Sequence, residues 1–205
     1  MFTKNNSSQF MLFVLIAAWA LTSGCATQQT DSAMTQSELT VRGQYLVTTG
    51  GCNDCHTPWV VDMNGVPMPD STRLLSGHPE NEPYPVWQPA DAARHTFVKS
   101  NATNTAWAGP WGVSFTANLT PDRETGLGEW TEEAFLQALR TGKHQGQPNG
   151  RDILPPMPWF NYGQLTDADL KAIWAYLRTI KAIKNQDPLP IQPTEATDST
   201  NSRED

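Results

Sequence analysis

Two cysteines and a histidine stand close together early in the chain, in the segment Cys52-Asn53-Asp54-Cys55-His56. With this C-x-x-C-H spacing, two thiols can reach the two vinyl groups on one edge of a haem, and the adjacent imidazole can bind its iron. The motif therefore predicts one covalently attached haem c. Cys52 and Cys55 are the predicted thioether residues, and His56 is the predicted axial ligand.

Three other uses of such cysteines have to be weighed. A thioredoxin-like C-x-x-C lies at the start of a helix after a strand, in a βαβ unit. A zinc site needs two further ligands at paired spacing. The sequence around Cys52 and Cys55 has neither pattern, and a plain disulfide would leave the adjacent His56 without a role.

The second axial ligand has several candidates downstream of the motif. Met157 lies in Leu154-Pro155-Pro156-Met157-Pro158-Trp159, where the prolines fix φ and stiffen the segment that presents the thioether. An isolated methionine is otherwise a core side chain. Met157 is the predicted ligand and His144, in a glycine-rich loop, is the first alternative. The remaining candidates are Met63, Met68, His78 and His95.

Three helices are predicted to position these residues. The first spans about residues 37–48. The second begins at Thr131, with acidic residues in its first turn, and ends at Gly142. The third begins at Thr166 and has its apolar face at helical spacing, with Lys184 at its basic end. Residues 57–118 contain eight prolines and little periodicity, which indicates a long loop packed through Trp87, Trp107 and Trp111.

The length of the chain limits the number of domains, and its charge limits the kind of partner it can bind. With 205 residues it has room for one domain plus extensions, and its formal net charge of −7 argues against a nucleic-acid partner. Residues 26–37 are polar and predict a tether. Residues 185–205 carry five acids, one arginine and three prolines, and predict a disordered acidic tail. The folded domain is therefore expected over residues 38–184.

The N-terminus has the composition of an export signal. Lys4 precedes an unbroken apolar run over residues 10–21, which is too short to span a bilayer as a helix, and small residues follow it. Ser23-Gly24-Cys25 resembles a bacterial lipobox, although Thr22 lies where leucine is usual; the alternative is an ordinary cleaved signal. We expect a signal peptide over residues 1–24, a lipid on Cys25 and a tether over 25–37. The predicted location is the periplasm, anchored to a membrane, with the outer membrane favoured.

The order of these elements resembles a class I c-type cytochrome over about residues 40–184. The resemblance implies an all-α cytochrome c fold, with three to five helices around a covalent haem and a long Pro/Trp-rich loop insertion. It also implies that the last helix crosses the first at Gly43. A narrower resemblance, from Phe115 to Trp159, is to the cytochrome c subunits of membrane-bound alcohol, aldehyde and gluconate dehydrogenases. By this resemblance Asn118 and Trp130 lie near the haem; otherwise they are turn and core residues.

The resemblance implies a carrier of single electrons rather than an enzyme. Its partners would be a redox donor and an acceptor, such as a membrane-bound dehydrogenase or a terminal oxidase. The dehydrogenase subunits typically carry three such domains, whereas these 205 residues contain one C-x-x-C-H. Two alternatives stay open: a haem peroxidase or small-ligand sensor with an open distal site, and a subunit of a dehydrogenase complex.

Positive charge is concentrated near Met157. Residues 143–184 hold six bases and three acids, whereas the rest of the predicted domain is acidic. Lys143, Arg151 and Lys171 are therefore candidates to surround an exposed haem edge and steer an acidic partner. The alternative is that they are solvated charges without a partner.

Overall fold

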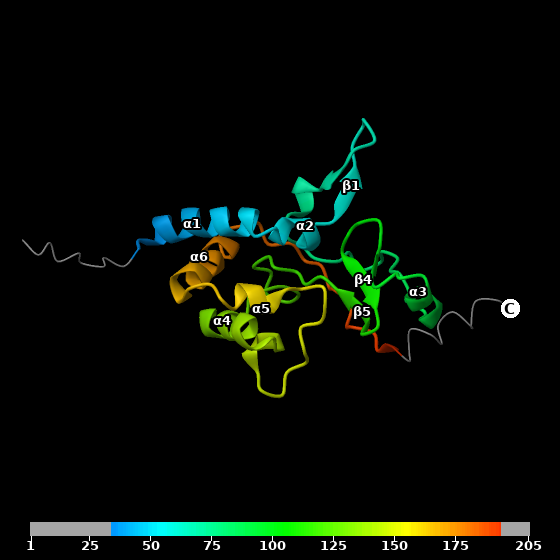
Figure 1. Cartoon of the computed structure of the whole chain (residues 1–205). Coiled ribbons are helices and arrows are strands. Elements are labelled where there is room, and N and C mark those ends of the chain that lie inside the picture. Colours follow the sequence, from blue (N-terminus) through cyan, green and yellow to red (C-terminus); the bar gives the residue numbers. More distant parts are fainter. Residues whose placement is uncertain (1–33, 194–205) are drawn as a thin grey trace, which may run out of the picture. The chain divides into compact units, whose positions relative to one another are not determined.

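The computed structural model describes residues 34–193 (Figure 1). The predicted signal peptide, Cys25 and the lipid expected on it lie outside this range, as do most of the tether and residues 194–205. The α-helices are α1 (Gln36–Thr49), α2 (Cys52–His56), α3 (Pro89–Ala93), α4 (Glu132–Thr141), α5 (Trp159–Tyr162) and α6 (Asp167–Leu177), and the 3₁₀-helices are η1 (Ser71–Arg73) and η2 (His144–Gly146). The strands are β1 (Trp59–Val61), β2 (Pro67–Pro69), β3 (Lys99–Ser100), β4 (Ala106–Gly109) and β5 (Gly112–Phe115).

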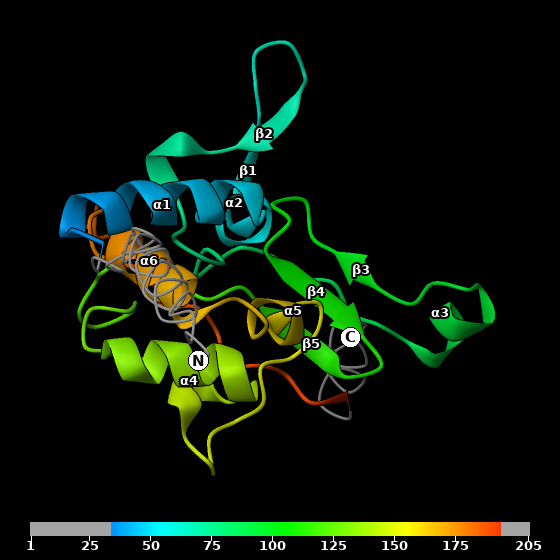
Figure 2. The same ribbon diagram turned by 60° about the vertical axis from the view of Figure 1, so that its left-hand side comes forward.

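The first and last helices cross where Gly43 allows it. A Cβ atom at Gly43 would lie 1.8 Å from the carbonyl oxygen of Ala172, so only glycine permits this approach of α1 to α6. Arg42 and Asp169 add an ion pair of 2.9 Å across the same crossing. Figure 2 shows α6 running across α1, with α4 on its other side. The predicted contact at Gly43 is confirmed.

Helix α4 begins and ends as its sequence predicts. The Thr131 hydroxyl accepts a hydrogen bond from Ala134 N–H at 3.1 Å, which satisfies one free amide of the first turn. At the other end Gly142 adopts a left-handed conformation, with φ of 68°. The buried face, with Phe135 and Leu139, packs into the main core.

Helix α6 starts at the predicted cap, Thr166, but it is shorter than its periodicity suggested. It ends at Leu177 rather than near Lys184. Beyond it the backbone finds partners outside the helix: Ile183 N–H donates to the hydroxyl of Thr120 at 3.1 Å, and Asn185 N–H donates to that of Thr125 at 3.0 Å. These tertiary hydrogen bonds replace the intrahelical ones, so the prediction of helix as far as Lys184 is wrong.

Residues 57–118 contain short strands as well as loops. Strands β1 and β2 form an antiparallel hairpin, and β3, β4 and β5 form a three-stranded antiparallel sheet in that order. Trp87 packs against a small second core around Ala108 and Val113, and Trp111 makes an edge contact with Phe97. The described residues thus combine helices with two small sheets, and the all-α cytochrome c fold stays a prediction.

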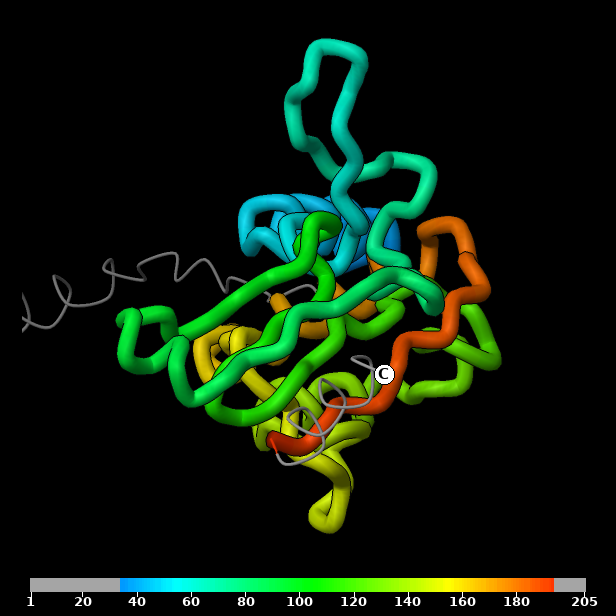
Figure 3. The backbone as a smooth tube through the Cα atoms, turned by 90° about the vertical axis from the view of Figure 1, so that its right-hand side faces the viewer, coloured from blue at the N-terminus to red at the C-terminus, as the bar shows by residue number. Residues whose placement is uncertain are grey.

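The chain after α6 packs back onto the domain instead of leaving it. Residues 178–193, which we call the strap, run beside the loop after β5 and reach β5 itself (Figure 3). There Ile191 and Val113 exchange two backbone hydrogen bonds of 2.9 Å. The predicted boundary at residue 184 therefore does not hold, because residues 185–193 have specific partners despite their polar, proline-rich composition.

The main core lies between α1, α4 and α6. Its buried side chains are Val47, Leu75, Leu127, Phe135, Leu136, Leu139, Leu170, Ile173, Trp174 and Leu177. Leu170 and Leu177 are fully buried, which anchors α6 at both ends. Between residues 34 and 193, no helix is both long and apolar enough to cross a bilayer.

Candidate haem site

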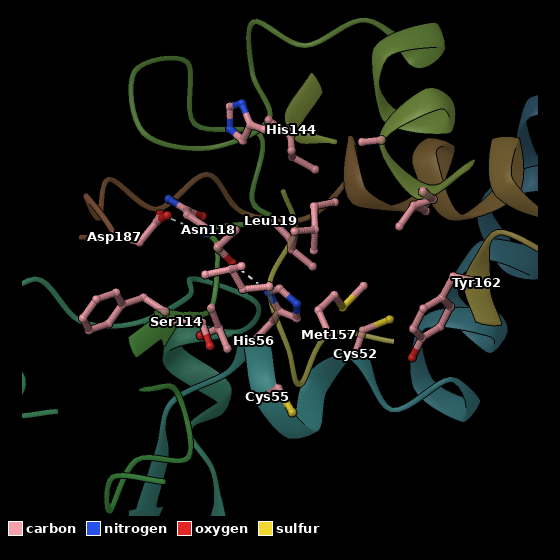
Figure 4. A pocket seen from close by; sticks show the side chains of 18 of the residues that line it. Cys52, Cys55, His56, Ser114, Asn118, Leu119, His144, Met157, Tyr162 and Asp187 are labelled. Atoms are coloured by element: carbon pink, nitrogen blue, oxygen red, sulfur yellow. Dashed lines mark hydrogen bonds between the residues drawn. The ribbon is translucent and has the colours of Figure 1, made fainter. Parts of the chain in front are cut away.

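One cavity, of about 510 Å³, brings the predicted site residues together. Cys52, Cys55, His56 and Met157 all line it, although His56 and Met157 are 101 positions apart in the sequence. Figure 4 shows His56, Met157, Cys52 and Cys55 among the side chains that line this cavity. The cavity is of the size typical of small-molecule sites, roughly 300–1,000 Å³.

The two thiols lie on α2, which follows directly after α1. Gly51 makes the turn between the two helices in a left-handed conformation with φ of 71°, which favours glycine. Both thiols are free. Burial raises the pKa of Cys52 to about 11 and raises that of Cys55.

These thiols lack the features of the competing sites. The cysteines of thioredoxin-like sites have lowered pKa values, whereas burial raises both here. The preceding element is helix α1 rather than a strand. No cluster of three or more His, Cys, Asp or Glu residues suited to a metal ion occurs within the described range, so a zinc site finds no support there.

His56 is buried, and the rest of the structure orients its ring. Its Nδ1–H donates to the carbonyl oxygen of Ala117 at 2.8 Å; the proton must be on Nδ1, since a carbonyl only accepts. Nε2 is then the nitrogen with a free lone pair, which is the form that binds a metal. Burial lowers the pKa of His56 and so favours the neutral ring.

The loop that carries Ala117 is held by backbone hydrogen bonds on both sides. His78 N–H donates to Thr116 O at 2.9 Å, and Leu119 N–H donates to Leu75 O at 2.9 Å. Gly77 N–H in turn donates to His56 O at 2.8 Å. Residues 75–78 therefore tie the Ala117 loop to the helix that carries His56, which fixes the distance between donor and acceptor.

Asn118 lines the cavity as the resemblance implied, but its amide binds protein groups. Its Nδ2 donates to Ile183 O at 2.8 Å, and its Oδ1 accepts from the Thr120 hydroxyl at 2.7 Å. The side chain is 2% exposed. Asn118 thus holds the strap against the Ala117 loop. Trp130 also lines the cavity, and its ring makes an edge contact with His144.

The Met157 segment is attached to the sheet. The Ser114 hydroxyl, on β5, donates to the carbonyl oxygen of Pro155 at 2.5 Å. Met157 N–H donates to Leu154 O at 3.3 Å, and the side chain packs against the main core. Strand β5 therefore helps to position the segment that carries Met157, which the prolines were predicted to stiffen.

The other candidate ligands fall into two groups. His144 lines the cavity, so it stays the alternative to Met157. His78 is fully buried, but both ring nitrogens are engaged, with the Thr105 hydroxyl at 2.9 Å and Glu82 O at 3.2 Å. Met63, Met68 and His95 are exposed and do not line the cavity.

Only one of the three predicted docking cations lines the cavity. Arg151 does, whereas Lys143 pairs with Asp152 at 2.6 Å. Lys171 lies at 3.9 Å from Glu132, on the side of α6 that faces α4. Lys171 therefore does not lie beside the cavity with Arg151, as the predicted docking surface would require.

The composition of the cavity fits a haem. Most of its lining is apolar, which suits a macrocycle, and it includes Val47, Leu119, Leu127, Phe135, Leu139, Ile173 and Leu177. Two buried polar atoms on the lining, Trp107 Nε1 and Thr116 Oγ1, have no hydrogen-bond partner within residues 34–193. Buried donors normally have partners, so these two are suited to the carboxylates of such a group.

Three residues of the site were not found from the sequence. Ala117 acts through its backbone, so no side-chain pattern marks it. Asp187 lies in the stretch assigned to a disordered tail, yet it lines the cavity. Tyr162, also on the lining, donates its hydroxyl to Gly50 O, and burial raises its pKa to about 12. Nothing in the sequence around Tyr162 indicates that this side chain lines the cavity.

Comparison with known proteins supports the resemblance. The chain is similar to cytochrome c subunits of membrane-bound dehydrogenases, as the segments around Asn118 and Met157 had indicated. No protein-family model matches the chain.

The individual relatives are much longer proteins. The fructose dehydrogenase cytochrome subunit of Gluconobacter japonicus is 28% identical over 190 residues, which cover 90% of this chain and 31% of that protein. The gluconate 2-dehydrogenase cytochrome c subunit of Pantoea cypripedii is 28% identical over 138 residues, 67% of this chain and 22% of that one. One of the subunits of the nicotinate dehydrogenase of Pseudomonas putida is 36% identical over 90 residues, 44% and 7% respectively. The chain spans less than a third of the length of these relatives.

Proposed function

We propose that this chain is a c-type cytochrome that carries single electrons with one covalent haem. The observation that carries the proposal is the convergence of two thiols, the oriented imidazole of His56 and the thioether of Met157 on one apolar cavity. The similarity to cytochrome c subunits supports it. When bound, the haem supplies an iron that alternates between two oxidation states.

Each residue has a distinct part in this function. Cys52 and Cys55 hold the group covalently, so it cannot be lost outside the cytosol. His56 and Met157 would each supply a ligand to the iron, so that neither of these two positions would be left for a substrate. The thioether favours the reduced iron, and the apolar walls limit the reorganisation of solvent when the charge changes.

Partners and location follow from the same proposal. The relatives are named as subunits of fructose, gluconate and alcohol dehydrogenases, so a membrane-bound dehydrogenase is the proposed electron donor. The acceptor would be a second redox protein, such as a terminal oxidase. The N-terminal signal and Cys25 favour a lipid-anchored protein of the periplasm.

Removal of the two thiols tests the proposal. The double variant Cys52→Ser and Cys55→Ser should release its haem into the organic phase on extraction with acidified acetone, whereas the wild type retains it with the protein. Cys25→Ser is the control for the loss of a cysteine, because Cys25 is the third cysteine of the chain and lies outside the C-x-x-C-H motif. Covalent haem that survives the double substitution, or a wild type that never acquires haem, would contradict the proposed function.

A further inference from the structure

A single peptide group lies between His56 and an acidic side chain. The carbonyl oxygen of Ala117 accepts the His56 Nδ1–H at 2.8 Å. The amide N–H of the same peptide group, which belongs to Asn118, donates to Asp187 Oδ1 at 3.1 Å. Figure 4 shows Asp187 beside Asn118, with His56 on the other side of this loop. The imidazole, the peptide and the carboxylate therefore form one hydrogen-bonded chain.

The strap holds the carboxylate in this position. Two residues before it, Asn185 Nδ2 donates to Ser76 O at 2.7 Å and to His78 O at 2.8 Å. Four residues after it, Ile191 pairs with Val113 on β5. Asp187 is thus fixed between two anchored points rather than carried on a free end.

Within residues 34–193, Arg151 is the cation that acts on Asp187. Burial raises its pKa, while the Asn118 amide and the Arg151 guanidinium favour the ionised carboxylate. Arg151 also lines the cavity, as does His144, whose pKa is lowered by burial and by the charge of Arg151. Asp187 itself is partly buried against the cavity, where electrostatic effects exceed those at the surface.

We propose that Asp187 is a positioning residue that tunes the electron-donating strength of His56 through the Ala117–Asn118 peptide group. The inference rests on the proposed function, because it takes His56 as a ligand of the iron.

Hydrogen bonds in a chain polarise one another, and this gives the direction of the effect. A carboxylate that accepts from the peptide N–H increases the electron density on the carbonyl oxygen of the same peptide. That oxygen then binds the Nδ1–H of His56 more strongly, which makes Nε2 a better donor to a metal. A stronger donor stabilises the higher charge on the iron, so Asp187 lowers the reduction potential.

The substitution Asp187→Asn separates charge from shape. Asparagine keeps the Oδ1 acceptor for Asn118 N–H but carries no negative charge. The equilibrium constant for reduction of the haem, from a redox titration of the full chain, should rise by roughly threefold to tenfold. In the reduced protein the ring Nδ1–H of His56 should also exchange faster with solvent, because its hydrogen bond weakens.

Asp152→Asn is the matched control for a general loss of charge. Asp152 pairs with Lys143 and its side chain is 67% exposed, so removal of this carboxylate should leave both the potential and the exchange rate close to the wild type. Where Asp187→Asn does not fold, Asp187→Ser removes the same charge with a smaller side chain, and the same two measurements apply.

The outcomes distinguish the inference from the proposed function. Haem content and ligand spectra are recorded first. A wild type that lacks covalent haem, or in which histidine does not bind the iron, overturns both the proposed function and the inference. With haem and ligation intact, an equilibrium constant for Asp187→Asn equal to that of Asp152→Asn overturns the inference alone. A rise confined to the Asp187 variants, with faster Nδ1–H exchange, supports it.

Discussion

The cavity has two walls that are built by different forces. The helical wall comprises α1, α2, α4 and α6 and lines the cavity with packed apolar side chains such as Phe135, Leu139 and Ile173. The loop wall comprises residues 114–119, 151–158 and 187–190, and hydrogen bonds between distant segments hold it in place. The helical wall also carries both thiols and His56, whereas the loop wall carries Met157 and the acceptor for His56.

This difference separates the attachment of the cofactor from the tuning of its ligands. Apolar packing tolerates small shifts, and the helical wall has only to bury a flat ring beside two thiols. Ligand orientation depends on particular donors and acceptors, and the loop wall supplies the carbonyl that orients His56 and the hydrogen bond that holds the Met157 segment. We therefore expect changes in the helical wall to affect stability and changes in the loop wall to affect ligation.

The largest loss of stability is expected at the crossing of α1 and α6. In Gly43→Val the new side chain has to displace the backbone at Ala172, and we expect about 3 kcal/mol or more to be lost from the free energy of unfolding. Urea denaturation measures this loss. Val41→Ala changes the same helix at a side chain that is 66% exposed and should cost about 0.5 kcal/mol or less. Equal effects of the two variants would show that the crossing does not limit the stability of the helical wall.

A smaller loss of stability, with a change of ligation, is expected for Met157→Ala. Truncation of this partly buried side chain should cost about 2 kcal/mol. The haem should stay attached, the ferric spectrum should lose its thioether-to-iron band, and the reduction potential should fall. Met63→Ala, at a fully exposed methionine, should change none of these quantities. An unaltered ferric spectrum in Met157→Ala would instead assign the ligand to His144, or leave the position open as in a peroxidase or sensor.

The smallest effect on stability is expected in the loop wall, at the hydrogen bond that attaches the Met157 segment to β5. Ser114→Ala removes the hydroxyl that donates to Pro155 O and should cost about 1 kcal/mol. The Met157 segment loses its attachment to β5, so the thioether band should become weaker on heating than in the wild type. Thr141→Ala serves as the control, because it removes an exposed hydroxyl that bonds Gln137 O and Lys143 N–H rather than the Met157 segment. A thioether band as heat-stable as that of the wild type would mean that the prolines alone hold Met157.

Local sequence patterns predicted most of the helical wall. Thr131, Gly142 and Thr166 mark the ends of helices through caps that depend only on neighbouring residues. The C-x-x-C-H spacing is likewise local. The close approach at Gly43 is instead implied by the family resemblance. Ligation by Met157 stays a prediction, although the structure places this residue on the same cavity as His56.

The loop wall could not be predicted in the same way. Its acceptor for His56 is a backbone carbonyl, which every residue type provides, so Ala117 carries no signal in the sequence. Asp187 lies in a polar segment whose composition resembles that of a disordered tail, and its order comes from partners 60 or more residues away, such as Asn118. Such long-range hydrogen bonds leave no periodicity to detect.

The burial of the thiols bears on how the mature protein is made. A thiol reacts with a vinyl group as the thiolate, and burial, which raises the pKa of Cys52 to about 11, disfavours that form in the folded chain. In the proposed cytochrome, the folded chain is thus a poor substrate for its own modification. The two thioether bonds are therefore expected to form before the chain folds. Folding then buries the completed bonds between the two walls of the cavity.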